Sequence, residues 1–201
     1  MKRIEICGGI ASGKTTLATL LAESISATLV HEQFRENPFW SSFYAEPTIW
    51  VEEKNFCFLV QHIGGIKAAR DAEFTICDYA VSQDLAYASL VPRREHASLM
   101  LALHDHLYSV LPPPTLIVYL KCEPHVLLQR IRARARTEET NITIDYLATL
   151  NRAIETLLNE HANRAPVHCI SSDLVNFATD TATAVSVKRD ILASVSRALI
   201  P

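Results

Sequence analysis

Apolar and polar positions along this chain follow two alternating patterns. Short apolar runs, which are typical of buried strands, occur at residues 3–7, 27–31, 73–77, 115–120 and 166–170. Longer segments with apolar residues at helical spacing lie between them, at residues 14–25, 50–70, 94–110, 124–133, 143–161 and 183–199. Strands that alternate with helices in this order predict an α/β fold, in which helices flank a five-stranded parallel sheet.

The ends of the predicted strands indicate where a functional site would lie. A length of 201 residues without internal repeats suits a single domain over residues 1–201. In a parallel α/β sheet, ligands bind at the carboxyl ends of the strands. The residues that directly follow the strands are therefore the first candidates: Gly8 to Lys14, Glu32, Asp78, Cys122-Glu123 and Ser171-Ser172-Asp173.

The strongest motif lies between the first predicted strand and the first helix. It fits the pattern G-x-x-x-x-G-K-S/T of a phosphate-binding P-loop and comprises Gly8, Gly9, Ile10, Ala11, Ser12, Gly13, Lys14 and Thr15, followed by Thr16. Backbone N–H groups of such a loop surround an anion, and the helix N-terminus adds partial positive charge. We expect Lys14 to reach the β- and γ-phosphates of ATP and the Thr15 hydroxyl to hold Mg²⁺. The motif predicts a P-loop NTPase fold of three layers.

Two carboxylates follow neighbouring apolar runs. Glu32 ends the second run, where it could face the γ-phosphate and take a proton from an attacking hydroxyl. A solvated acid in a loop is the alternative interpretation. Asp78 ends the third run, where an acid of a P-loop fold commonly holds Mg²⁺, directly or through water. It could instead cap the helix that follows.

An arginine-rich segment lies near residues 130–141. Its basic side chains alternate along the chain: Arg130, Arg132, Arg134 and Arg136. On a helix, Arg130 and Arg134 share one face, so their guanidinium groups can clamp a transferring phosphoryl group. The segment would then form a lid over the P-loop. A solvated basic face and an RNA-binding patch are the alternatives, but a net charge of −3 and the lack of interleaved aromatic residues argue against nucleic acid.

Composition indicates the cellular compartment in which the protein works. Five widely spaced cysteines without a C-x-x-C motif suit a reducing compartment rather than a disulfide framework. The longest apolar runs, such as residues 116–120, are far too short to span a bilayer. The first predicted strand begins almost at the N-terminus, which leaves no room for a signal peptide. We therefore expect a cytoplasmic protein that does not contact a membrane.

Further short motifs follow the P-loop in a fixed order. They are His31-Glu32, Asn37-Pro38-Phe39, Phe43-Tyr44, Trp50, Asp78 with Asp84 and Tyr87-Ala88 after it, and the run from Arg130 to Glu139. Over roughly the first 155 residues, this series resembles the deoxyribonucleoside kinases. The aromatic residues between Phe34 and Phe58 belong to the same region, where they could stack a base or a sugar or form part of the core.

The resemblance implies a phosphate-donor half of the site. Arg130, Arg134 and Arg136 would grip the phosphates, and Asp78 would work beside the magnesium ion. Asp173 would lie near the adenine of ATP, in a loop that matches the family only loosely. Members of the family are usually dimers packed through helices, so the resemblance also implies a homodimer.

The resemblance implies an acceptor half as well. Glu32 would deprotonate the 5′-hydroxyl of the nucleoside, while Tyr44 and Glu139 would hold the 3′-hydroxyl of its sugar. Trp50 would line the same pocket, and Asn55 stands where the family has a glutamine that contacts the base edge.

Several positions of the acceptor half depart from the family pattern. Asn55 is one methylene shorter than the glutamine, and His62 stands where the family often has arginine. Tyr79 and Ala80 replace the arginine and serine of the D/E-R-S motif, in which the arginine helps to position the glutamate and the 5′-oxygen. A tyrosine at this position can donate one hydrogen bond but carries no charge. An acceptor that is not a standard deoxyribonucleoside, or weakened activity, would explain these departures.

These observations predict ATP-dependent phosphoryl transfer to the 5′-hydroxyl of a small nucleoside-like acceptor. Positioning and charge neutralisation would carry the rate, with Lys14, Glu32, Arg130 and Arg134 as the catalytic residues. Two alternatives remain open at this point. A nucleoside monophosphate kinase shares the fold and would need further cations, for which Arg35 and Arg70 are candidates. A non-catalytic nucleotide-binding subunit would bind ATP without transferring its phosphate.

Overall fold

The computed structural model describes residues 1–160 and 164–199. Within these residues, five strands form one parallel sheet in the order β2-β3-β1-β4-β5. The strands are β1 (Lys2–Gly8), β2 (Thr28–Val30), β3 (Phe74–Cys77), β4 (Leu116–Lys121) and β5 (Val167–Ser171). Each coincides with a predicted apolar run to within two residues, which confirms the predicted sheet.

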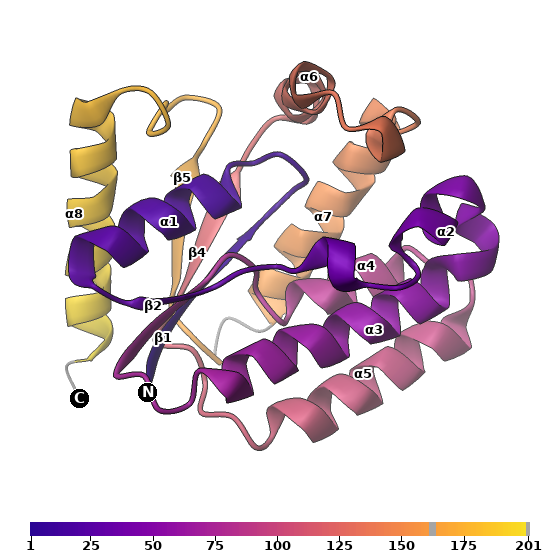
Figure 1. Cartoon of the computed structure of the whole chain (residues 1–201), viewed down its shortest axis with the longest axis horizontal. Helices are drawn as coiled ribbons and strands as arrows, with labels where there is room; N and C mark the ends of the chain where they lie inside the picture. Colours follow the sequence, from indigo (N-terminus) through magenta and orange to yellow (C-terminus); the bar gives the residue numbers. More distant parts are fainter. Residues whose placement is uncertain (161–163, 200–201) are drawn as a thin grey trace.

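Helices cover both faces of this sheet (Figure 1). The long helices are α1 (Lys14–Ile25), α3 (Pro47–Ala68), α5 (Arg94–Tyr108), α6 (Pro124–Arg134), α7 (Ile144–Glu160) and α8 (Thr181–Ala198). The short helices are η1 (Phe34–Glu36), α2 (Trp40–Ala45), α4 (Gln83–Ser89) and η2 (Thr137–Glu139). The last residue of the predicted helix 143–161 lies outside the described part of the chain. The short helices were not predicted, because three to seven residues are too few to show a helical period.

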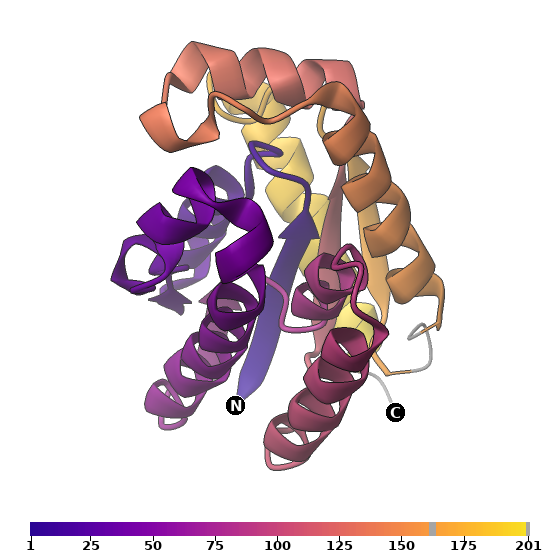
Figure 2. The ribbon, with the colours of Figure 1, turned by 90° about the vertical axis from the view of Figure 1, so that its right-hand side faces the viewer.

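Two layers of helices enclose the sheet between them. Helices α1 and α8 pack on one face, where Leu17 and Ile191 join the side chains of Ile4, Ile6 and the neighbouring strands. Helices α3, α4, α5 and α7 cover the other face. Helix α6 crosses above the carboxyl ends of the strands, over the P-loop (Figure 2). This arrangement confirms the three-layer α/β P-loop fold.

Two charged side chains are buried inside β1. Arg3 and Glu5 form an ion pair of 2.8 Å and are fully buried. The second carboxylate oxygen of Glu5 accepts a hydrogen bond from the Val81 N–H at 3.0 Å. Gln83, two residues farther along, accepts one from the Gly8 N–H at 2.9 Å. The turn between β3 and α4 is thereby fixed against the strand that enters the P-loop.

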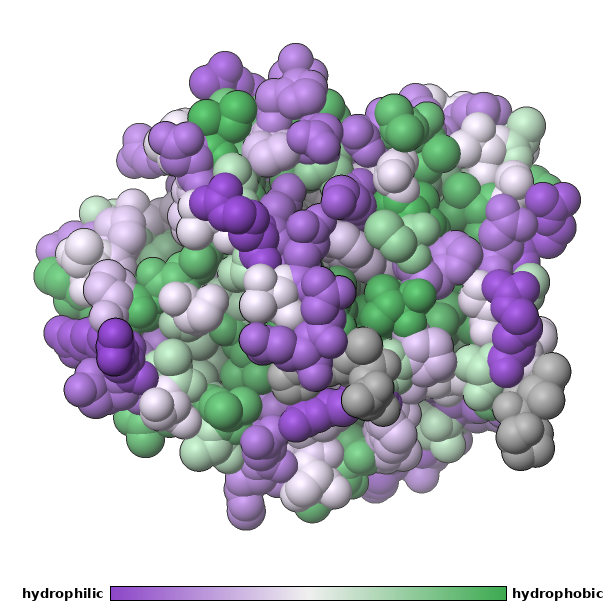
Figure 3. Space-filling view, turned by 180° about the vertical axis from the view of Figure 1, so that it is seen from behind, coloured by the Kyte–Doolittle hydropathy of each residue, from purple (hydrophilic) through white to green (hydrophobic). Residues whose placement is uncertain are grey.

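Within the described residues, no helix combines the length and apolar character needed to cross a bilayer. On the face opposite to the view of Figure 1, hydrophilic and hydrophobic residues are interspersed (Figure 3).

Candidate active site

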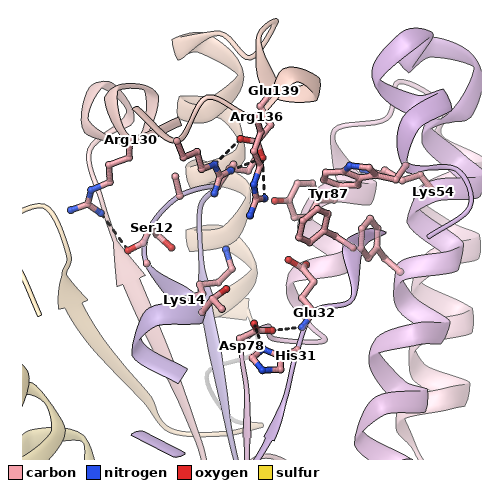
Figure 4. Close-up of a pocket in the computed structure, with 18 of the residues that line it drawn as sticks. Ser12, Lys14, His31, Glu32, Lys54, Asp78, Tyr87, Arg130, Arg136 and Glu139 are labelled. Atoms are coloured by element: carbon pink, nitrogen blue, oxygen red, sulfur yellow. Dashed lines mark hydrogen bonds and ion pairs between the residues drawn. The ribbon is translucent and has the colours of Figure 1, made fainter. Parts of the chain in front are cut away.

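A cavity of about 600 Å³ opens at the carboxyl end of the sheet. Its walls come from the P-loop, the segment after β2, helices α2 and α3, the start of α4, and the region from α6 to α7. Most residues predicted for the site line it: Ile10, Ala11, Ser12, Gly13, Lys14, Thr15, Thr16, Glu32, Tyr44, Asn55, Asp78, Arg130, Arg134, Arg136 and Glu139. Figure 4 shows part of this set, which the fold gathers from positions more than 100 residues apart.

The P-loop adopts a conformation that requires glycine. Gly8 and Gly13 have φ angles of 151° and 102°, which side chains with a Cβ rarely adopt. Gly8 and Gly9 do not line the cavity, but their carbonyl oxygens accept hydrogen bonds from Lys14 Nζ at 2.9 and 3.0 Å. Burial lowers the pKa of Lys14, against the opposing effect of the Glu32 carboxylate. The lysine is therefore held at the mouth of the loop, where a phosphate can replace the two carbonyl partners.

Asp78 fixes the segment that carries Glu32. One Asp78 oxygen accepts a hydrogen bond from the backbone N–H of Glu32, and the other lies 3.4 Å from His31 Nδ1. Burial raises the pKa of Asp78, and the bond from Glu32 opposes that effect. Because β2 and β3 are neighbours in the sheet, their carboxyl ends bring these acids together. Asp78 thus acts as a local anchor and also lines the cavity.

The fit of Asp78 and Thr15 to Mg²⁺ follows from their chemistry. Among the described residues, no group of three or more His, Cys, Asp or Glu side chains could hold a metal ion. Mg²⁺ bound with a nucleotide usually takes only one or two protein oxygens and completes its coordination with phosphates and water. The Thr15 hydroxyl at the start of α1 and the Asp78 carboxylate suit that arrangement.

Arginines of the predicted lid are held by partners in this structure. Arg134 and Arg136 both contact Glu139, with Arg134 Nε 2.7 Å from Glu139 Oε2 and Arg136 Nη1 3.5 Å from Glu139 Oε1. Arg130 donates to the Ser172 carbonyl at 2.6 Å and to the Ser12 carbonyl at 3.4 Å. All three arginines line the cavity. Figure 4 shows Arg130 beside Ser12 of the P-loop and Arg136 beside Glu139.

Aromatic rings and one buried ammonium group form the opposite wall. Lys54 is only 6% exposed, and its Nζ lies 4.2 Å from the ring centre of Phe43, 5.2 Å from that of Tyr87 and 5.9 Å from that of Phe58. Burial lowers the pKa of Lys54 to about 8, against the raising effects of Asp84 and Glu32. This wall can hold a flat ring and present a donor to it.

Two titratable residues beneath this wall form a chain that ends at Glu32. His62 Nδ1 lies 2.8 Å from Asp84 Oδ2, and His62 Nε2 lies 3.6 Å from Glu32 Oε1. Burial alone would raise the pKa of Glu32, but His62 and Lys14 hold it below its ordinary value. Glu32 is therefore ionised at neutral pH, as a general base must be.

Besides Gly8 and Gly9, three residues predicted for the site, Tyr79, Trp50 and Asp173, do not line the cavity. Tyr79 is 3% exposed, and its hydroxyl donates to the His62 carbonyl at 2.8 Å. Trp50 stacks on Phe39 with ring centres 5.8 Å apart. Asp173 lies in the loop after β5. Packing with neighbouring elements directs the first two side chains away from the cavity.

Sequence reasoning gave no role to several residues that line or support the site. Lys54 was not singled out, because a lysine on a helix is usually solvated. Asp84 and Tyr87 appeared in the motif series without an assigned function. The contact between His62 and Glu32 joins two elements that are 30 positions apart, so no local pattern could reveal it.

The chain is similar to a family of known proteins. The sequence model of the family "Deoxynucleoside kinase" matches residues 4–199. Deoxyguanosine kinase of Bacillus subtilis (strain 168) is 27% identical over 162 residues, which cover 78% of each chain. Deoxyadenosine kinase of Dictyostelium discoideum is 26% identical over 171 residues, which cover 82% of this chain and 69% of that protein.

Solved structures show the same fold. The structure of deoxyadenosine kinase from M. mycoides with bound dCTP matches with a TM-score of 0.79 at 19% identity, over 96% of this chain and 99% of that chain. The structure of the same protein with bound dATP also has a TM-score of 0.79, over 96% and 100% of the two chains. Together with the sequence match, which spans nearly all of the chain, these findings show that the protein belongs to the deoxynucleoside kinase family, whose members phosphorylate nucleosides with ATP as the donor.

Proposed function

We propose that this protein transfers the γ-phosphoryl group of ATP to the 5′-hydroxyl of a deoxynucleoside bound in the cavity. One observation carries the proposal: Lys14 of the P-loop and the ionised Glu32 point into the same cavity from opposite sides (Figure 4). A cation that binds phosphate and a base that accepts a proton are the two groups this reaction needs.

The donor half would neutralise the charge of the phosphates. Lys14 would contact the β- and γ-phosphates, and the guanidinium groups of Arg130 and Arg134 would stabilise the charge of the transferring group. Arg136 would bind the nucleotide from the lid, residues 130–141. Thr15 and Asp78 would hold Mg²⁺, which supplies positive charge at the phosphates when it is bound.

The acceptor half would orient the 5′-hydroxyl toward Glu32. The Glu32 carboxylate would take the hydroxyl proton as the oxygen attacks the γ-phosphorus. Tyr44 and Glu139 would bind the 3′-hydroxyl of the sugar. The rings around Lys54 would enclose the base, with Lys54 and Asn55 as hydrogen-bond donors to its edge. This arrangement would exclude water and so limit ATP hydrolysis.

The nucleoside monophosphate kinase alternative has less support. It would require cations near Glu32 or Asp78 to hold the phosphate of the acceptor. Arg35 and Arg70 do not line the cavity, and Arg70 donates to the carbonyl of Lys67 at the end of α3. The family match to deoxynucleoside kinases favours a neutral hydroxyl acceptor.

A transfer assay tests the proposal. ATP labelled in its γ-phosphate, with Mg²⁺, would be offered to a panel of deoxynucleosides, ribonucleosides and nucleoside monophosphates. We expect a labelled deoxynucleoside monophosphate that disappears when Lys14 is replaced by Ala. Binding of ATP without a labelled product across the panel would contradict the proposal and favour a non-catalytic nucleotide-binding protein.

Two further properties stay predictions. The resemblance to the family implies a homodimer, and the cysteine usage suggests the reducing cytoplasm. We also propose that residues 1–201 act as one kinase domain with its lid.

A further inference from the structure

Glu32 has a basic neighbour that takes no part in the proposed binding of ATP. Within the described residues, His62 is the basic side chain that forms an ion pair of 4.0 Å or less with Glu32. Lys14 is held by the P-loop carbonyls, and Lys54 lies among aromatic rings. His62 Nε2 is buried and has no hydrogen-bond partner among the described residues, although it lies 3.6 Å from Glu32 Oε1.

The orientation of the His62 ring is fixed from several sides. Its Nδ1 lies 2.8 Å from Asp84 Oδ2, and its plane stacks on the Tyr79 ring at 4.0 Å between centres and 15° between planes. Phe58 packs against it at 5.5 Å. The Tyr79 hydroxyl donates to the His62 carbonyl, which fixes the backbone of α3 at this point. A ring held in this way cannot turn its Nε2 away from Glu32 without breaking these contacts.

Both ring nitrogens of His62 face a carboxylate. Asp84 and Glu32 accept hydrogen bonds when ionised but cannot donate them, so each nitrogen is best matched as a donor. Burial alone would lower the pKa of His62, but the two carboxylates raise it to about 10. The side chains of His62 and Asp84 are 5% and 8% exposed, which keeps bulk water from screening this pair. His62 is therefore an imidazolium at neutral pH.

We propose that His62, held by Asp84, is the positioning residue that orients the Glu32 base. This inference rests on the proposed function of Glu32. It also explains two departures from the family pattern together, His62 and Tyr79, which lie 17 positions apart in the sequence. Tyr79 lacks the charge of the arginine that it replaces, but its ring supports His62, which brings a positive charge to Glu32 from helix α3.

Kinetics of His62→Gln test the proposal, because glutamine removes the charge and retains a hydrogen-bonding amide. We expect kcat to fall about 10- to 100-fold, the range for a misplaced reacting group, while KM for ATP stays unchanged. Asp84→Asn should also lower kcat, but by a smaller factor. The His62 ring would keep its place and lose only the negative charge beside Nδ1. The matched control is His168→Gln, which removes a partly buried histidine of β5 outside the cavity lining and should leave kcat unchanged.

The split between kcat and KM distinguishes positioning from a structural role. A structural defect would also weaken ATP binding, whereas loss of the His62 contact to Glu32 should lower kcat alone. The charged groups around His62 are Glu32 after β2, Asp84 on α4 and Lys54 on α3, and Lys14 acts on Glu32 from the P-loop. An unchanged kcat in a folded His62→Gln protein would overturn the proposal.

A measurement on the unaltered protein keeps the test valid if a variant fails to fold. Nitrogen-15 NMR of protein labelled at histidine, with His62 assigned through its contact to the Tyr79 ring, should report an imidazolium at pH 7.5. A neutral His62 ring at this pH would overturn the inference. If the unaltered protein shows no phosphoryl transfer at all, the proposed function fails instead, and the NMR result still decides whether His62 is a cation.

Discussion

At the residue scale, the aromatic wall of the cavity presents the buried ammonium group of Lys54 to a ligand. Glu32 and Asp84 both contact His62, whereas the Lys54 ammonium lies against aromatic faces and lines the cavity. An ammonium group has three donors and no acceptor. Lys54 therefore suits a base that presents a carbonyl oxygen or a ring nitrogen to it.

Replacing Lys54 by Met should weaken the use of the acceptor selectively. Methionine fills a similar volume among the rings but donates no hydrogen bond. Because a hydrogen bond to a charged group is worth about 1.5–3 kcal/mol, we expect kcat/KM for the acceptor to fall about 10- to 100-fold. KM for ATP should not change. Lys67→Met, an exposed site on the same helix, is the control; equal effects of the two substitutions would exclude this role for Lys54.

Single residues could be predicted from the sequence where a strand end determines their place. Glu32 and Asp78 follow apolar runs, so the rule for parallel sheets was enough to bring them to the cavity. Tyr79 directly follows Asp78, yet its side chain turns into the core, where its hydroxyl donates to the His62 carbonyl. The contacts of His62 depend on how α3 packs on α4, which the sequence pattern does not specify.

At the element scale, β1 and the turn before α4 form one supporting unit below the cavity. Glu5 joins them through its bonds to Arg3 and Val81. The short apolar runs made all five strands predictable, including β1 with its two charges. Helices α2 and α4 were not predicted, although α2 contributes Phe43 and Tyr44 to the cavity.

The substitution Glu5→Gln should destabilise the fold strongly. It leaves the guanidinium group of Arg3 buried without its carboxylate, which typically costs about 3–5 kcal/mol. Urea unfolding monitored by circular dichroism measures the loss in the free energy of unfolding. Glu73→Gln, at an exposed position before β3, should change it by less than about 0.5 kcal/mol. A Glu5 variant as stable as this control would contradict the account of the supporting unit.

The lid, residues 130–141, should become less accessible when substrates bind. Arg132 is exposed and offers a trypsin site within the lid. We expect an unreactive ATP analogue with Mg²⁺ to slow cleavage after Arg132 several-fold, because the arginines of the lid would then contact phosphates. Mass spectrometry of the fragments measures the rate, and cleavage after the exposed Arg189 on α8 is the internal reference. Equal rates at Arg132 with and without the analogue would argue against a closing lid.

At the scale of the whole molecule, α3 lines the cavity together with the P-loop and the lid, and it packs against α5. These two helices also expose apolar side chains on the outside, with Val60 54% and Leu99 58% exposed. The overall architecture followed from the alternation of strands and helices. The cavity itself did not, because its volume depends on how α2, α3 and α6 are packed around the P-loop.

We expect the protein to be a homodimer in solution, with α3 and α5 at the interface. Light scattering coupled to size exclusion should give twice the mass of 22.4 kDa. The double variant Val60→Asp/Leu99→Asp should shift this mass toward the monomer, because charges at an apolar interface are costly to bury. A monomeric unaltered protein at micromolar concentration would contradict the expectation.

The central claim is that Glu32 is the base in phosphoryl transfer within this cavity. Its most direct test is the rate of a single turnover by Glu32→Gln, with ATP, Mg²⁺ and the preferred deoxynucleoside at saturation. Because a general base typically contributes 10²- to 10⁴-fold, we expect the rate to fall by about that factor while the dissociation constant of ATP stays within about twofold. A variant that binds ATP normally and transfers phosphate at the rate of the unaltered protein would contradict the account.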